Sequence, residues 1–459
     1  MPSRSRTAVI GGGMAGCAAA RELVKAGRDV VLFEAADGLG GRARSWHRPE
    51  IEPDVGINLM CASIYSLMLE MIREHGLENE LSSISSNLLV VDNGVPAALP
   101  SDSVTALLSY RHVRLRDRIA FIVASMREML VNRNRIDLFD PVKLAEFDDG
   151  TTATEYGNRI LSRRGFDYML RSQIEGFWNF DCDRISVSHA RAMLAQMGGA
   201  KFYVFSRGME VLAEKNAEGA DVRLGHEVEE LRLDGERVRV TARGNDGTVV
   251  SEEFDDIVVA VPAPIAAKLA SALPQRAVSE ETRTYLESQE YEPALSVSYL
   301  VDRDALPAET HIMAGGAEDP KIRNMITYPK RVRTGRGTTV DKLLVFAYPG
   351  RAVTRRLLGL PPEQQFAEVT PLLRTMWPSF PSDPEPFQIA ERPYGFPLPT
   401  PGRYRRSVQV MRGQRAPVVF AGDYFSSPTT EAAMISGVRA ARVLTGSGDP
   451  LGPVRPGSR

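Results

Sequence analysis

Three glycines near the start of the chain have a spacing that can bring the backbone close to a phosphate. Gly11, Gly13 and Gly16 follow a short β-rich run at 7–10 and precede a stretch of helix formers at 17–26. In such a strand–glycine–helix unit the first glycine allows a tight turn, the second allows close backbone approach, and the third lets the helix contact the strand. The helix then points free N–H groups and the positive end of its dipole at the phosphates.

An acidic residue completes this pattern. Glu34 lies eighteen residues after Gly16, at the end of a second apolar run at 29–33. A carboxylate in that place can accept hydrogen bonds from both hydroxyls of a ribose. The glycine spacing alone is a weak signal, but the strands, the helix and the acid together predict a dinucleotide site.

Two further segments favour FAD over NAD. Just after Glu34, Gly40 and Gly41 keep the backbone close to a ligand, and Arg42 can neutralise a pyrophosphate. Near the other end of the chain, Gly422-Asp423 stands between an apolar strand and a helix. An aspartate there can accept a hydrogen bond from a ribityl hydroxyl, and the helix points N–H groups at a reduced, anionic flavin. Gly422-Asp423 alone would also fit a helix N-cap.

Together these motifs resemble the flavin amine oxidase superfamily, which includes monoamine oxidases, protoporphyrinogen oxidases and phytoene desaturases. The resemblance covers most of the chain and rests on VIGGGMAG, FEAADGLGGRARS, DVGINLM, HEVEEL, VVAVP and AGDYFSSPTTEAAMISGVRAA. It implies that Val228 touches the adenine through its backbone and that Asp54 and Gly56 lie near the flavin ring. The cofactor contacts that we expect are Gly11, Gly13, Met14, Ala15, Gly16, Glu34, Ala35, Gly40, Gly41, Arg42, Val228, Gly422, Asp423 and Thr430.

The substrate side departs from the amine oxidases of the superfamily. Their substrate-domain strand usually carries a lysine, but the similar strand at 292–297 has none. Of the two aromatic residues that often flank the flavin, Tyr394 could supply one, whereas Thr429 stands near the place of the other. No cysteine lies near the late motif, so we expect FAD to be held without a covalent bond.

No catalytic base stands out in the sequence. Tyr394 and Lys201 are the two candidate catalytic residues, with a rim tyrosine and a solvated lysine as the alternative interpretations. Phe177, Trp178 and Phe180 could line an aromatic substrate pocket, although we favour a core cluster.

These departures place the chain nearer the porphyrinogen oxidase and desaturase branches. We expect an oxidoreductase that takes a hydride from a C–N or C–C bond of a mid-sized, partly apolar metabolite, with re-oxidation by O2. The alternatives are a flavin-dependent isomerase without net oxidation and a non-catalytic relative of the fold.

The motifs require a discontinuous cofactor domain, because its pieces stand at both ends and in the middle of the chain. The fold class that we predict is α/β, with a Rossmann-like FAD-binding domain and an interleaved α+β substrate-binding domain. Segments 1–75, 200–280 and 405–445 form the first domain, and 76–199 and 281–404 form the second. A flexible tail at 446–459 follows, since this segment is rich in Gly, Pro and Ser.

The composition of the chain argues against nucleic acid, metal and membrane as partners. A net charge of −2 over 459 residues gives no global field that would recruit nucleic acid. The three cysteines form no C-x-x-C pair, which argues against a metal and fits a reducing cytoplasm. The segment 114–131 is apolar on one face with interspersed arginines. We expect it to be a buried amphipathic helix rather than a membrane-surface helix, and therefore expect no membrane contact.

Overall fold

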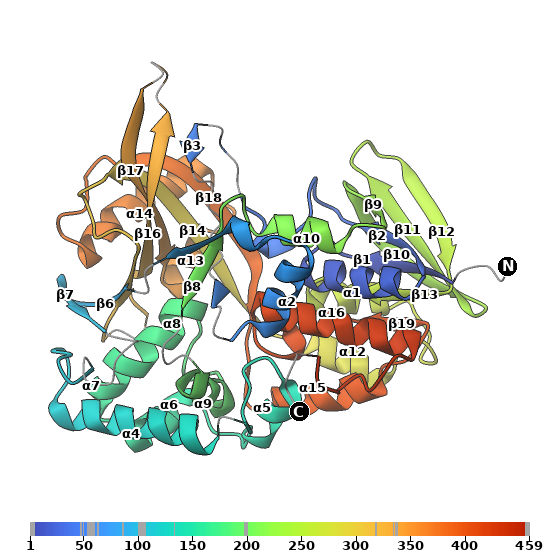
Figure 1. Ribbon diagram of the computed structural model, residues 1–459, viewed down its shortest axis with the longest axis horizontal. Helices are drawn as coiled ribbons and strands as arrows, with labels where there is room; N and C mark the ends of the chain where they lie inside the picture. The colour runs from blue at the N-terminus through green and yellow to red at the C-terminus, as the bar shows by residue number, and fades with distance from the viewer. Residues whose placement is uncertain are drawn as a thin grey trace.

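The computed structural model describes residues 5–45, 48, 50–52, 60–61, 64–84, 87–99, 107–132, 134–196, 201–316, 319–333, 335 and 338–454. Figure 1 shows a parallel sheet with its helices on one side of the molecule and a larger sheet on the other. A group of helices lies below the larger sheet in this view. Asp54 and Gly56 lie outside the described residues.

A five-stranded parallel sheet carries the glycine motif. Its order is β19-β13-β1-β2-β9, and every neighbouring pair is parallel. The strands are β1 (Arg6–Ile10), β2 (Asp29–Phe33), β9 (Asp221–Arg223), β13 (Asp256–Val259) and β19 (Val418–Phe420). The strands read as short apolar runs because both faces of the sheet are covered.

Alternate residues of β1 enter different cores. Val9 packs with helices α1 (Met14–Lys25) and α16 (Thr430–Thr445) on one face. Ala8 and Ile10 pack on the other face, against α11 (Ala263–Ala270) and a meander of three antiparallel strands. The meander consists of β10 (His226–Asp234), β11 (Arg237–Gly244) and β12 (Val249–Phe254). This layered arrangement confirms the predicted Rossmann-like class.

The second sheet is mostly antiparallel, with the order β18-β14-β17-β16-β15-β6-β7, and β3 (Ile51–Glu52) pairs with β16. Its other strands are β6 (Asn87–Asp92), β7 (Val95–Ala98), β14 (Tyr291–Asp302), β15 (Thr310–Ala314), β16 (Ile322–Arg333), β17 (Thr339–Pro349) and β18 (Glu385–Pro397). Helices α13 (Arg351–Leu357) and α14 (Pro362–Met376) cover one face through a separate apolar core. A small sheet joins β4 (Met60–Cys61), β5 (Leu81–Ile84) and β8 (Phe202–Phe205).

The remaining elements are mainly helical. Strands β5, β6 and β7 interrupt the stretch between residues 64 and 196. The helices of this stretch are α2 (Ser66–Glu74), α4 (Leu115–Val131), α5 (Pro141–Glu146), α6 (Ala153–Ile160), α7 (Arg163–Gly165), the π-helix η3 (Phe166–Arg171), α8 (Ser172–Trp178) and α9 (Val187–Gln196). Elsewhere lie α10 (Glu210–Asn216), α12 (Glu280–Glu287) and α15 (Arg403–Gly413), with short 3-10 turns η1 (Gly41–Ala43), η2 (Glu78–Glu80) and η4 (Asp423–Phe425).

The strands of the parallel sheet come from the three segments predicted for the cofactor domain, and all strands of the second sheet except β3 come from the other two segments. The division into domains stays a prediction. In the proposed tail, the carbonyls of Leu451 and Pro453 accept hydrogen bonds from Arg439 and Arg442 of α16.

Helix α4 corrects one expectation. The segment 114–131 does form a helix, but its apolar stripe faces solvent, and the residues that it buries are Asp117, Phe121, Ala124 and Glu128. The expectation of a buried apolar face is therefore wrong. Periodicity alone indicates that a helix has two faces, but it does not say which face meets the protein. None of the helices in the described ranges has both the length and the apolar composition that crossing a membrane requires.

Candidate active site

A cavity of about 1100 Å³ lies where the two sheets meet. The carboxyl ends of β1, β2 and β19 all reach it, which is where ligands of open parallel sheets bind. Sites for one drug-sized ligand occupy roughly 300–1,000 Å³. This cavity is therefore large enough for a dinucleotide together with a small substrate.

The glycine loop follows β1 directly. Gly11 has φ = +104°, a conformation that favours glycine, and a Cβ on Gly16 would overlap the carbonyl oxygen of Gly11. Beside Gly13, by contrast, a Cβ would meet nothing within 4 Å, because that side opens into the cavity. Helix α1 starts at Met14 without a side-chain cap. The N–H groups of its first turn thus remain available to an anionic ligand.

Glu34 is held in place by the backbone. Its carboxylate accepts hydrogen bonds from the N–H of Gly12 at 2.6 Å and from the N–H of Ala36 at 2.8 Å. Both bonds fix the side chain at the end of β2, where it lines the cavity. A carboxylate has four lone-pair directions, so two bonds leave capacity for ribose hydroxyls.

Two predicted cofactor residues from opposite ends of the chain, Arg42 and Asp423, form an ion pair. Arg42 Nη2 donates to Asp423 Oδ1 at 2.8 Å, and Arg42 Nη1 donates to the carbonyl of Gly395 at 2.7 Å. Burial opposes the charge on Arg42, but the buried carboxylate of Asp423 outweighs it, so the pKa of Arg42 lies above its ordinary value. These bonds connect η1, which follows β2, to the loop after β19 and to strand β18.

Most of the predicted cofactor residues share this cavity. The predicted cofactor residues that line it are Gly11, Gly13, Met14, Ala15, Glu34, Ala35, Gly40, Gly41, Arg42, Val228, Gly422, Asp423 and Thr430. Gly16 is not among the lining residues. It faces the carbonyl of Gly11 instead, and its lack of a Cβ allows α1 to approach the glycine loop.

Tyr394 does not reach the cavity. The side chain is 39% exposed and packs edge-on against Tyr291. Strand β18 does present Ala390 and Arg392 to the cavity, and strict alternation would place Tyr394 on the same face. The pairing with β14 shifts register between Arg392 and Phe396, however, and this irregularity turns Tyr394 outward.

Lys201 also lies outside the cavity. Its side chain is exposed, whereas the next residue, Phe202, is buried and lines the cavity. Phe202 begins β8, and neighbouring residues of a strand point to opposite sides. Of the two candidate catalytic residues, neither is therefore placed to touch a ligand in this cavity.

The far end of the cavity is aromatic. Phe177, Trp178 and Phe202 line it together with His311, whose ring centroid lies 5.4 Å from that of Phe177. Phe180, by contrast, is fully buried in the core and is not a lining residue. Burial lowers the pKa of His311 to about 4, so the imidazole is neutral near pH 7.

Polar groups at this end are neutral or cationic. Ser296 from β14 lines it, as do Tyr348 and Arg392. Among the described residues that line the cavity there is no lysine. The lining carboxylates are Glu34, Asp37, Glu227 and Asp423, which follow the sheet of the glycine motif or belong to its meander.

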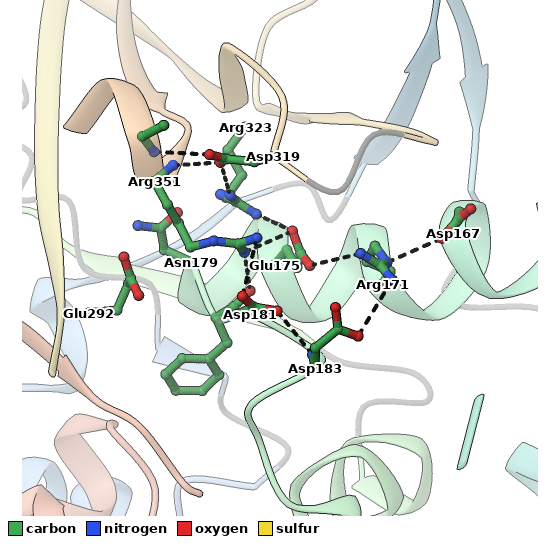
Figure 2. Close-up of polar contacts among 12 residues, drawn as sticks. Asp167, Arg171, Glu175, Asn179, Asp181, Asp183, Glu292, Asp319, Arg323 and Arg351 are labelled. Atoms are coloured by element: carbon green, nitrogen blue, oxygen red, sulfur yellow. Dashed lines mark hydrogen bonds and ion pairs between the residues drawn. The ribbon is translucent and has the colours of Figure 1, made fainter. Parts of the chain in front are cut away.

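We call the aromatic end of the cavity, with Phe177, Trp178, Phe202 and His311, the substrate chamber. A buried ionic network supports the wall of this chamber (Figure 2). Arg323 lines the cavity and donates to Glu175 of α8 and, at 3.1 Å, to Asp319. Arg351 donates to the same Glu175 oxygen at 3.3 Å, and its backbone N–H donates to Asp319 at 2.7 Å. Burial raises the pKa of Glu175 in spite of these guanidinium groups.

The network and most of the polar chamber were not expected from the sequence. Arg323, Arg392 and Tyr348 stand in strands whose pattern predicts a sheet but not the face that meets the cofactor domain. Asn179 has φ = +56° at the end of α8, a conformation uncommon outside glycine, and it lines the cavity. An arginine within a strand is a signal that could have indicated Arg323 and Arg392.

The chain matches the family model of flavin-containing amine oxidoreductases over residues 14–445. Mitochondrial protoporphyrinogen oxidase of Nicotiana tabacum is 27% identical over 191 residues, which is 41% of this chain and 35% of that protein. Polyamine oxidase 3 of Oryza sativa is 26% identical over 273 residues, 55% of this chain and 51% of that protein. The matches thus span a third to a half of the length of these relatives.

Solved structures agree on the fold. A putative protoporphyrinogen oxidase from Exiguobacterium superposes with a TM-score of 0.70 at 16% identity, covering 97% of this chain and 100% of that chain. Cyclohexylamine oxidase from Brevibacterium oxydans superposes with a TM-score of 0.68 at 16% identity, covering 97% and 99%. Variants of a putrescine oxidase are similar as well, with a TM-score of 0.71 at 15% identity for one that covers 95% and 98%.

This chain belongs to the family of flavin-containing amine oxidoreductases. Membership confirms the family predicted from the glycine and late motifs, and with it a flavin as the cofactor. The open space beside Gly13, the uncapped first turn of α1 and the carboxylate of Glu34 fit an anionic dinucleotide.

Proposed function

We propose that this protein is an FAD-dependent oxidoreductase that takes a hydride from a C–N or C–C bond of a mid-sized, partly apolar metabolite, with O2 as the electron acceptor. The observation that carries the proposal is one continuous cavity. It joins the glycine loop, Glu34 and the Arg42–Asp423 pair to a chamber walled by Phe177 and Trp178. Cofactor and substrate would share this space, as hydride transfer requires.

The cofactor contacts are proposed on the same geometry. The first turn of α1 would hold the pyrophosphate, and Glu34 would accept from the adenosine ribose. Arg42 and Asp423 would stand at the ribityl and flavin end, next to Gly422 and Thr430. When bound, FAD supplies a two-electron acceptor, while the chain orients the reacting carbon and excludes water.

The charges in the chamber suggest which substrates fit. A cationic diamine would meet Arg392, whereas the described carboxylates that line the cavity belong to the dinucleotide end. Aromatic walls favour an apolar body, and Arg392 favours a neutral or carboxylate-bearing head group. The substrate we propose therefore differs in charge from putrescine. We further propose a cytoplasmic location, which the low number of cysteines and the lack of a C-x-x-C pair in the sequence suggest.

The absorption spectrum of the purified protein tests this function. It would be recorded under anaerobic conditions before and after addition of a porphyrinogen, a carotenoid precursor, an aromatic amino acid and putrescine. We expect a yellow protein that is bleached by a partly apolar or carboxylate-bearing compound and is unaffected by putrescine. Admission of air should then restore the colour, with one O2 consumed and one H2O2 formed for each hydride taken from the substrate.

Three other outcomes of this experiment would favour a different function or substrate. Product formation without O2 consumption would favour an isomerase, and a colourless protein that takes up no added FAD would contradict the proposal. Bleaching by putrescine alone would overturn the proposed substrate class but leave the cofactor assignment intact.

A further inference from the structure

Helix α4 exposes an apolar stripe to solvent. Among the described residues, fourteen large apolar side chains are well exposed, and seven of them lie on this one helix. Their exposed fractions run from 37% to 70%: Leu115, Ile119, Val123, Met126, Met129, Leu130 and Val131. Positions 115, 119, 123, 126 and 130 recur every three or four residues and so form one continuous stripe. Contiguous exposed apolar surface of this kind marks an interaction site.

The orientation of α4 is fixed from its inner side. Glu128 is buried and accepts from Arg191 Nε at 3.0 Å and from Asn132 Nδ2 at 2.8 Å. Asp117 is buried as well, and it accepts from the backbone N–H of Ser162 at 2.8 Å. The helix cannot rotate its apolar stripe inward without breaking these bonds in a buried place, which is costly. The exposed stripe is therefore built into the fold.

The charged residues of α4 that border the stripe are all arginines. Arg116 and Arg127 flank it on one side of the helix and Arg118 on the other, with Arg114 just before the first turn. The two acidic residues of the helix, Asp117 and Glu128, are the ones that point inward. An apolar stripe with arginines at its edges is the pattern of a helix that lies in a membrane surface.

We propose that α4 docks this protein reversibly on an anionic lipid bilayer, with the helix parallel to the membrane plane and its apolar stripe in the headgroup region. In Figure 1 the helix forms the lower edge of the molecule, and α6, α7 and α9 lie on its inner side. A flat surface can therefore approach it from outside. A second copy of this chain is a poorer partner, because a twofold contact would bring the arginines of both copies together.

Vesicle flotation with the full-length protein tests this docking. We expect binding to vesicles that contain phosphatidylglycerol, none to pure phosphatidylcholine vesicles, and weaker binding in high salt. Val123→Glu should weaken binding by about tenfold or more, because it places a carboxylate in the middle of the stripe. Val249→Glu, at another exposed valine position on β12, is the matched control and should bind as the unchanged protein does.

A second variant separates charge from folding. Arg116→Glu with Arg127→Glu leaves the apolar stripe intact and should also lose the preference for phosphatidylglycerol. Thermal unfolding of each variant reports on the fold independently of the membrane. Absence of binding to either kind of vesicle would overturn the proposal, as would equal losses in Val123→Glu and Val249→Glu. It would also be overturned by light scattering that shows a dimer which Val123→Glu converts into monomers.

Discussion

Arg392 shows how one residue can define the character of the substrate chamber. It stands on β18 opposite Ala294 of β14, and both residues line the cavity. Burial lowers the pKa of Arg392, yet a guanidinium remains charged at any ordinary pH. Its positive charge lies at the end of the cavity where we propose that the substrate binds, so it should select substrates by charge.

Arg392→Met tests this selection because it keeps most of the side-chain volume and removes the charge. We expect kcat/KM for a carboxylate-bearing substrate to fall by about 10–100-fold, mainly through KM, with little change for a neutral analogue. Arg392→Lys should recover part of the loss. Tyr394→Phe, two residues along the strand but outside the cavity, should behave like the unchanged protein. Equal losses with both substrates would show that Arg392 does not recognise charge.

His311 links the chamber to the pH dependence of stability. Its pKa is about 4 in the folded protein and about 6.5 in an unfolded chain. Between these two values the unfolded chain binds a proton that the folded protein does not. Stability from this group is thus complete above pH 6.5 and is lost as the pH falls toward 4.

His311→Gln removes this titration. Going from pH 7.5 to pH 5.0, the free energy of unfolding should fall by about 2 kcal/mol more in the unchanged protein than in the variant. Chemical denaturation at the two pH values measures the difference. A parallel decrease in both proteins would show that His311 is protonated in the folded state at pH 5.

At the scale of elements, helix α16 holds two cofactor loops at once. A Cβ on its Gly437 would overlap the carbonyl oxygen of Ala15 in the first turn of α1. At the preceding position, the Ser436 hydroxyl accepts a hydrogen bond from the N–H of Gly422 at 2.8 Å. The glycine loop after β1 and the loop after β19 therefore keep their places through the same helix.

Gly437→Ala should separate α16 from α1 and displace the first turn of α1. We expect FAD affinity to fall by about tenfold or more, with a loss of stability of about 1–3 kcal/mol, as for other overpacked sites. Gly413→Ala at the end of α15 is the control, since a Cβ there meets nothing within 4 Å. FAD titration by fluorescence and thermal unfolding measure both effects. An unchanged FAD affinity in Gly437→Ala would contradict a role for this contact.

Elements were predictable where a local pattern specifies them. The spacing of Gly11, Gly13 and Gly16 and the position of Glu34 give the β1-α1-β2 unit, because turn, helix and strand there depend on neighbours in sequence. The position of Tyr394 outside the cavity was not predictable in this way, because a register shift that depends on the pairing with β14 sets which face its side chain occupies. The solvent-facing stripe of α4 was missed because only its tertiary bonds at Glu128 and Asp117 determine its rotation.

At the scale of the molecule, a buried ionic network holds the helices against the large sheet. Glu175 comes from α8, Arg323 from β16 and Arg351 from the start of α13. All three side chains are less than a tenth exposed. Because Arg323 also lines the cavity, the network connects the contact between these two parts of the fold to the shape of the substrate chamber.

Glu175→Gln leaves two buried guanidinium groups without their shared carboxylate. Removing one partner from such a network typically costs about 3–5 kcal/mol, since the remaining charges are not solvated. Glu229→Gln breaks an exposed pair with Arg243 on the meander and should lower the stability far less, because solvent screens exposed charges. Chemical denaturation of both variants compares the two costs. If the network also shapes the chamber, Glu175→Gln should raise KM while FAD affinity stays unchanged, because Glu34 and the first turn of α1 lie at the other end of the cavity. A loss of FAD affinity as large as the rise in KM would instead mean that the whole cavity depends on this one buried contact.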